Sequence, residues 1–236
     1  MRNILCLVLV AACSHSTPAP AIVKPVAEAK PAELEPFDDK VRQDFFDGMG
    51  GDTEAMDRAM KVCEETLARN PKHPEAMVWH GAGVVWQARL AFQAGDRAKG
   101  IELYTAGLAE MDAAVVLAPT DVGVRIPRGA VVLAMAPHAP EPEKTKLLER
   151  GISDYEATLE TQRAYFGSLT LHAREQLLYG LTDGYANLGK REMAQASYQR
   201  MTIDAAGSEL LPRAASRARG EEVAGPTPCV QCHQGM

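Results

Sequence analysis

Apolar residues recur at helical spacing from Phe37 to about Arg219, and no stretch alternates with period two for long enough to predict a strand. Between breakers of this pattern we expect helices of about 12 to 24 residues, joined by short turns into antiparallel hairpins. The breakers are Gly48 to Gly51, Asn70-Pro71, Gly95-Asp96, Pro119, Pro137 to Pro142, Gly167, Gly189 and Gly207. The pattern therefore predicts an all-α fold.

Three segments repeat one arrangement of small and large residues, in which a small residue lets two helices touch and a larger one packs the hairpin. Its members are Ala59, Cys63, Thr66, Leu67 and Pro71; then Gly95, Gly100, Tyr104, Gly107 and Leu108; then Leu178, Leu181, Tyr185, Gly189, Ala194 and Tyr198. Over residues 53–206 the chain resembles the tetratricopeptide repeat (TPR) family. The resemblance implies a TPR-like array of antiparallel helical hairpins over residues 37–219.

The match to the TPR pattern is uneven along the chain. The second unit runs on to Pro119, and the third, from Asp121 to Ala164, lacks the signature and carries a proline-rich turn. We therefore expect irregular geometry and helices longer than the family norm. A generic helical bundle is the alternative that the pattern leaves open.

The first residues have the composition of an export signal. Arg2 precedes an apolar run, Ile4 to Val10, that is too short to span a bilayer, and Val10-Ala11-Ala12-Cys13 resembles a lipobox. This resemblance implies a lipoprotein signal peptide over residues 1–12 and a lipid anchor on Cys13. An ordinary signal peptide or a buried apolar start remains the alternative.

Residues 13–36 are predicted to be a membrane tether, because five prolines in this segment disfavour helix. About 23 residues at ~3.1 Å each would reach roughly 70 Å. Ser14, and not an Asp, directly follows the predicted anchor. This resembles the signal that sorts lipoproteins of Gram-negative bacteria to the outer membrane. We therefore expect a protein of the cell envelope, lipid-anchored at the outer membrane and facing the periplasm.

The sharpest local motif is Cys229-Val230-Gln231-Cys232-His233, in a predicted flexible tail over residues 220–236. C-x-x-C-H is the c-type haem attachment motif, in which Cys229 and Cys232 bind the porphyrin and His233 binds the iron. From this chain's own composition the pattern arises by chance in only about 0.3% of sequences. Water, Met236, His172 or His138 are candidates for the second axial ligand.

Two other interpretations of the tail cysteines stay open. Cys229 and Cys232 can form a disulfide or a redox-active pair in an oxidising compartment. They can also form half of a zinc site, which would need further ligands because structural zinc prefers four. Cys63 lies within a helical pattern and is predicted to be a small core residue.

Three arginines are candidates for a partner groove. Arg125 and Arg128 flank Pro127, which we expect to open a helix, and Arg174 lies on the next first helix. First helices line the concave face of TPR arrays, where guanidinium groups would clamp a partner's carboxylate. The alternative is that Arg125 and Arg128 pair with Asp or Glu side chains of this same chain.

The remaining polar and aromatic residues give weaker signals. His80 is predicted to be a satisfied core or groove residue, and His73 a solvated turn residue. We expect the large aromatic residues to pack in the core, namely Trp79, Trp86, Phe92 and Tyr104.

The charge balance and the motif content exclude some classes of function. The net charge is −6 with 46% hydrophobic residues, so the chain lacks the basic excess typical of nucleic-acid binders. No phosphate loop, nucleophile elbow or zinc-protease motif is present, and the acidic residues are spread as solvated charge, so we expect no enzyme. The sequence predicts a membrane-tethered scaffold that docks an unidentified protein or peptide and carries haem c for envelope electron transfer. The alternative is a pure protein-binding lipoprotein whose tail cysteines form a disulfide.

Overall fold

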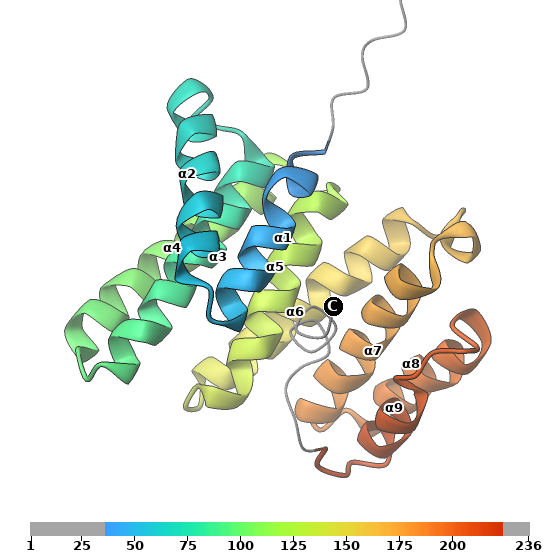
Figure 1. The fold of residues 1–236 in the computed structure, drawn as a ribbon. Coiled ribbons are helices and arrows are strands. Elements are labelled where there is room, and N and C mark those ends of the chain that lie inside the picture. The colour runs from blue at the N-terminus through green and yellow to red at the C-terminus, as the bar shows by residue number, and fades with distance from the viewer. Residues whose placement is uncertain (1–35, 224–236) are drawn as a thin grey trace, which may run out of the picture. The chain divides into compact units, whose positions relative to one another are not determined.

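The computed structural model describes residues 36–223, and within them every regular element is helical. Figure 1 shows how these helices follow one another. In chain order they are α1 (Phe37–Gly50), α2 (Thr53–Arg69), α3 (Pro74–Gln93), α4 (Arg97–Leu117), α5 (Val122–Met135), η1 (Ala136–His138), α6 (Glu143–Thr161), η2 (Phe166–Ser168), α7 (Leu171–Asn187), α8 (Arg191–Asp204) and α9 (Leu211–Ala218). The prediction of an all-α fold is confirmed.

Side chains at the starts of several helices satisfy amide groups that the helix itself leaves without an acceptor. Asp52 accepts from the Ala55 amide at 3.1 Å, and Asp96 accepts from the Lys99 amide at 3.0 Å. Asp121 similarly caps α5, and Thr170 caps α7. These short polar residues follow the predicted breakers, so local sequence determines where the helices begin.

Glycines with positive φ end several helices and reverse the chain. Gly51, Gly95 and Gly189 have φ values of 120°, 83° and 74°, a region that residues with a Cβ rarely adopt. Each turn brings the next helix back against the previous one. The chain therefore folds as consecutive hairpins.

Consecutive helices pack in pairs, α1 with α2, α3 with α4, α5 with α6 and α7 with α8, while α9 covers α7 and α8. The first helices of successive pairs also contact one another, α1 with α3, α3 with α5, α5 with α7 and α7 with α9. Helices α3 and α4, of 20 and 21 residues, form the most extensive of these pairs.

Glycines let α3 and α4 approach closely. A methyl group on Gly81 would lie 2.8 Å from the Gly107 carbonyl oxygen, and one on Gly107 would lie 2.6 Å from the Gly81 carbonyl oxygen. Tyr155 of α6 uses the same principle, because its ring lies against Gly129 of α5 and Gly180 of α7. Small residues therefore set the distance between helices in both halves of the described region.

The buried side chains form two apolar clusters. One includes Phe45, Met56 and Met111 from the first helices, and the other includes Leu178 and Met201 from the last. Leu133 and Leu188 are partly buried against both clusters, so the core is continuous from α1 to α9.

Among the sequence-based predictions for single residues, some hold and others are wrong. Cys63 is fully buried, as predicted. Pro127 lies inside α5 and does not open it, because Asp121 caps the helix six residues earlier. His73 lies in the predicted turn, but it is half-buried and caps α3 by accepting from the Ala76 amide, so it is not fully solvated. Phe92 is 42% exposed, because it packs over Gly100 near the end of the α3–α4 hairpin and not in the core.

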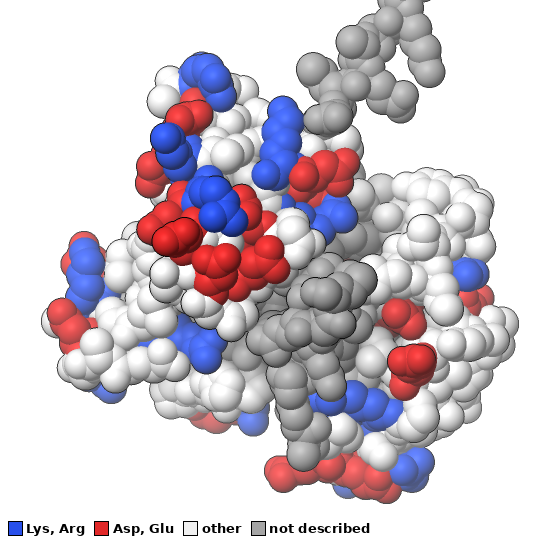
Figure 2. Space-filling view, viewed as in Figure 1, with Lys and Arg blue, Asp and Glu red and all other residues white. Residues whose placement is uncertain are grey.

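Charged side chains of both signs are interspersed over α1 and α2 on the face shown in Figure 2. On these two helices Arg42 pairs with Asp38 and Asp39, and Arg58 pairs with Asp44 at 2.7 Å. No helix among residues 36–223 combines the length and apolar character needed to cross a bilayer.

Candidate functional site

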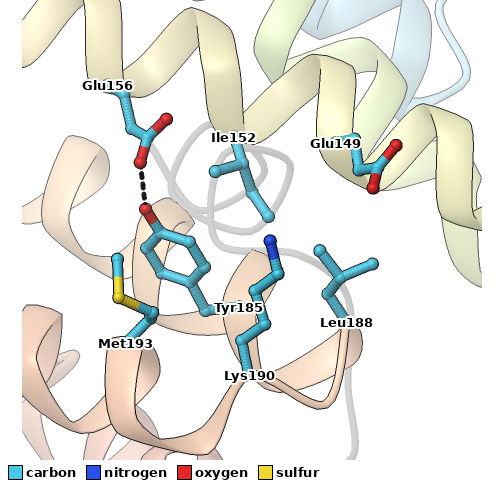
Figure 3. A pocket seen from close by; sticks show the side chains of 7 residues that line it. All are labelled: Glu149, Ile152, Glu156, Tyr185, Leu188, Lys190 and Met193. Carbon is cyan, nitrogen blue, oxygen red and sulfur yellow. Dashed lines mark hydrogen bonds between the residues drawn. The ribbon is translucent and has the colours of Figure 1, made fainter.

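A shallow, open groove lies on α6, α7 and α8, and Figure 3 shows its first part. It consists of two cavities of about 240 and 290 Å³, which share Glu156, Tyr185 and Met193. The first is also lined by Glu149, Ile152, Leu188 and Lys190; the second is also lined by Leu159, Glu160, Arg163, Leu178, Leu181, Ala196, Ser197 and Arg200. We call these two cavities together the α6–α8 groove.

The helical period explains which residues form the floor of the groove. Ile152, Glu156 and Leu159 follow one another at spacings of three and four on α6, so they lie on one face of that helix. The turn at Gly189 then brings Lys190 and the start of α8 back beside them. Met193, in the first turn of α8, is 46% exposed and lies where the two cavities meet.

The polar groups of the groove differ in how they are satisfied. The Tyr185 hydroxyl donates to Glu156, and burial, together with this bond, raises the pKa of the phenol. Arg163 pairs with Glu160, and Arg200 pairs with Asp204. In contrast, Lys190 forms no ion pair with any residue in the described region, and Figure 3 shows its side chain directed into the cavity.

This set of groups is suited to binding more than to catalysis. The phenol of Tyr185 stays protonated at neutral pH, because its pKa is raised further above its ordinary value. Lys190 offers a cation, Met193 offers a soft thioether, and Ile152 and Leu188 offer apolar surface, while Glu149 and Glu156 line the same cavity with carboxyl groups. The α6–α8 groove therefore presents apolar surface bordered by charges of both signs.

Arg125 and Arg128, predicted to line a partner groove, converge instead on a carboxylate of this chain. Asp154 is fully buried and accepts from Arg125 Nη1 at 2.8 Å and from Arg128 Nη2 and Nε at 2.7 Å. Arg128 also donates to Asp112 at 2.8 Å, and Arg150 lies 3.4 Å from the same carboxylate. This is the internal pairing that the sequence left open as the alternative.

Arg174, the third predicted groove residue, lies apart from this network. Its Nη1 donates to the Gly167 carbonyl oxygen at 3.2 Å. None of the three arginines lines either cavity of the α6–α8 groove. The structure therefore brings Arg125 and Arg128 together at Asp154, whereas Arg174 bonds to the turn that precedes α7.

Asp154 is the buried charged residue that sequence reasoning missed. The acidic residues were predicted to be solvated, yet Asp154 lies between Gly151 and Thr158 on the buried face of α6. An aspartate in phase with buried apolar positions is the signal that could have revealed it, because an unpaired charge is excluded from such a face.

The haem motif and the lipid anchor lie outside the described residues. This holds for Cys13, Cys229, Cys232 and His233, and also for Met236. The two histidines considered as second axial ligands are described. His138 is exposed at the end of η1, and His172 is exposed in the first turn of α7, 3.5 Å from Glu175.

Two further observations bear on metal binding in the described region. Within residues 36–223 there is no group of three or more His, Cys, Asp and Glu side chains that could hold a metal ion. His80, predicted to be satisfied within the protein, is half-buried and hydrogen-bonded to Glu110 at 2.7 Å.

A scan against protein-family models, a search of curated proteins and a search of solved structures each found no match for this chain.

Proposed function

We propose that this protein is a lipid-anchored, TPR-like scaffold of the cell envelope that carries haem c on its C-terminal segment. In this proposal the helical array docks a protein or peptide partner, and the haem gives the assembly a role in electron transfer. Cys13 holds the protein to the membrane, and residues 13–36 are the tether.

The observation that carries the proposal is the C-x-x-C-H motif at Cys229 to His233. The donor set fits haem c, because two thiols form the thioether bonds and one imidazole is the axial ligand. The bound haem supplies one-electron redox chemistry. The chain's own residues fix it covalently and orient it relative to the array.

The environment of Cys63 supports an assignment of thiol chemistry to the tail. Cys63 is fully buried in α2, and burial raises the pKa of its thiol to about 12. A buried thiol that stays protonated is unreactive. The proposal attaches the lipid to Cys13. Cys229 and Cys232 then remain as the reactive pair of the mature chain.

The pattern of helix contacts supports the TPR-like part of the proposal. Successive first helices contact one another, as α1 with α3 and α5 with α7, and second helices contact the next first helix, as α2 with α3 and α6 with α7. This is the packing expected of stacked hairpins, in which each repeat contacts mainly its neighbours. Such arrays present extended surfaces to protein partners.

Expression in an exporting host with haem-maturation machinery tests the redox half of the proposal. We expect haem staining on a denaturing gel and a c-type pyridine haemochrome spectrum, and we expect Cys229→Ala with Cys232→Ala to abolish both. The circular dichroism of that variant should stay helical. A colourless wild-type protein, in a strain that matures a control cytochrome, would contradict the haem assignment and favour the pure binding scaffold.

Metabolic labelling with a fatty acid tests the anchor. The wild-type protein should incorporate the label, and Cys13→Ala should not, because the lipid is attached through that thiol. Cys6→Ala is the matched control and should leave labelling unchanged, since Cys6 lies in the segment predicted to be removed. Labelled Cys13→Ala protein would exclude this anchor.

A further inference from the structure

We propose that the outer face of α4 binds the same face of a second copy of this chain, so that the protein forms an antiparallel dimer with two-fold symmetry. The outer face is the exposed side of α4, opposite the side that packs on α3, and it is made up of Ile101, Thr105, Ala106, Ala109, Ala113, Val116 and Leu117. This surface is separate from the α6–α8 groove, and the proposal depends neither on the haem nor on the lipid anchor.

Helix α4 is apolar on both of its sides. On one side, Gly107 and Met111 are buried against Gly81 of α3. On the other side, Val116 is 80% exposed and Ile101 is 49% exposed. A helix that is apolar all round is normally covered all round. The outer face is therefore an apolar surface that the described residues of the same chain leave open.

The carboxylates in the central part of α4 are bound by other helices. Residues 103–117 contain only two charged side chains, Glu110 and Asp112. His80 of α3 is hydrogen-bonded to Glu110 at 2.7 Å, and Arg128 of α5 donates to Asp112 at 2.8 Å. These contacts hold both carboxylates at the flanks of the outer face, so its centre carries no charge.

The remaining polar groups of the outer face are satisfied within α4. The Thr105 hydroxyl donates to the Ile101 carbonyl oxygen at 2.8 Å. Glu102, at the N-terminal edge of the face, pairs with Lys99 at 3.1 Å. The face can therefore be removed from water without leaving a buried polar group unpaired.

An antiparallel copy of α4 is complementary to this face in shape. With Ala109 on the two-fold axis, Ala106 lies opposite Ala113 of the other copy, and Ile101 lies opposite Val116 of the other copy. The small central residues let the two helix axes approach closely, and the larger residues pack at both ends. Because each copy presents the same residues, the contact closes on itself as a dimer.

The charges at the ends of α4 also favour an antiparallel copy. Apart from the cap Asp96, the N-terminal turn carries the cations Arg97 and Lys99, and the last turn carries no basic residue. Both features oppose the dipole of a single helix. In the antiparallel pair, Arg97 and Lys99 approach the negative C-terminal end of the other α4 and Asp121, which follows it. A lipid surface would give both ends of α4 the same environment, so a second copy is the better occupant.

The molar mass of the full-length protein tests the dimer, by sedimentation in detergent solution over a range of concentrations. One helix face buries less area than a standard interface, so we expect a reversible dimer that forms between about 1 and about 100 µM. Ala109→Arg brings two cations together at the axis and should leave the protein monomeric over this range. Helical circular dichroism should stay unchanged, because Ala109 is exposed and arginine is a good helix former.

Two further variants make the test specific to the outer face. Ala196→Arg makes the same substitution at an exposed position of α8 and should keep the dimer. Ala109→Cys, in a chain that also carries Cys229→Ala and Cys232→Ala, should form a disulfide-linked dimer on oxidation, whereas the same chain with Ala109 should not. A wild-type protein that is monomeric at about 100 µM, a dimer that persists in Ala109→Arg, or Ala109→Cys protein that does not cross-link overturns the inference. None of these outcomes bears on the haem or on the lipid anchor.

Discussion

At the scale of single residues, the buried carboxylate of Asp154 has the largest expected effect on stability. It accepts from Arg125 and Arg128, whose side chains are only 15% and 11% exposed. Removing one partner of a buried ion pair leaves charge without compensation, and this typically costs about 3–5 kcal/mol. The three side chains therefore act as one unit that joins α5 to α6.

We predict that Asp154→Ala lowers the free energy of unfolding by about 3–5 kcal/mol, because two buried guanidinium groups lose their shared acceptor. Chemical denaturation of the full-length protein measures this loss, because its described helices lie in residues 36–223. Asp44→Ala is the control, because it removes an exposed pair with Arg58 and should cost about 1 kcal/mol or less. Equal effects of the two substitutions would show that the buried network adds no special stability.

His80 gives a prediction for pH. The hydrogen bond that His80 donates to the Glu110 carboxylate raises the pKa of His80 above its ordinary value of 6.5, and burial opposes this rise only in part. The folded protein then binds this proton more tightly than the unfolded chain does. The contribution is fully present below pH 6.5 and is lost as the pH rises through the raised pKa.

Denaturation of wild type and His80→Gln at a series of pH values checks this prediction. The difference in unfolding free energy between the two proteins should be largest near pH 6 and should shrink towards pH 9. His138→Gln, at an exposed position, serves as the control. A difference between wild type and His80→Gln that grows with pH would contradict the assignment of the sign.

At the scale of helices and turns, local sequence was informative. Asp52, Asp96 and Asp121 cap the helices that follow them, and Gly189 has the positive φ that its turn requires. These features depend on neighbouring residues in the chain, so a single sequence reveals them. Pro127 was misassigned because proline favours the first turn of a helix, whereas here Asp121 starts the helix earlier and the chain continues through the proline.

The crossing of α3 and α4 provides a prediction at this scale. Gly81→Ala places a methyl group 2.8 Å from the Gly107 carbonyl oxygen and should cost about 1–3 kcal/mol, since backbone cannot move aside as a side chain can. Alanine otherwise favours helix over glycine, so a loss of stability reports the contact itself. Thermal and chemical unfolding measure the effect.

Gly167→Ala is the matched control for this substitution. No atom lies within 4 Å of the position where its methyl group would stand, so the change should stay within about 0.5 kcal/mol. If Gly81→Ala is as stable as wild type, α3 and α4 do not cross at this glycine pair.

At the scale of the whole molecule, the site was harder to predict than the fold. The residues of the α6–α8 groove are spread from Glu149 to Arg200 over three helices, and only their packing brings them together. In the same way, the helical phase of Asp154 could have marked it as buried, but its pairing with Arg125 and Arg128 follows only once α5 and α6 are packed together. The haem motif needs no such packing, because its residues are adjacent in sequence.

The intact mass of the mature protein tests the central claim most directly. Expressed in an exporting host that matures cytochromes c, the purified chain should begin at Cys13 and should carry the added masses of one covalent haem and of the lipid. Cys229→Ala with Cys232→Ala should lose the haem mass and keep the lipid mass. A wild-type mass that equals the lipidated polypeptide, or that polypeptide less two hydrogens for a disulfide, would contradict the account of a haem-bearing scaffold.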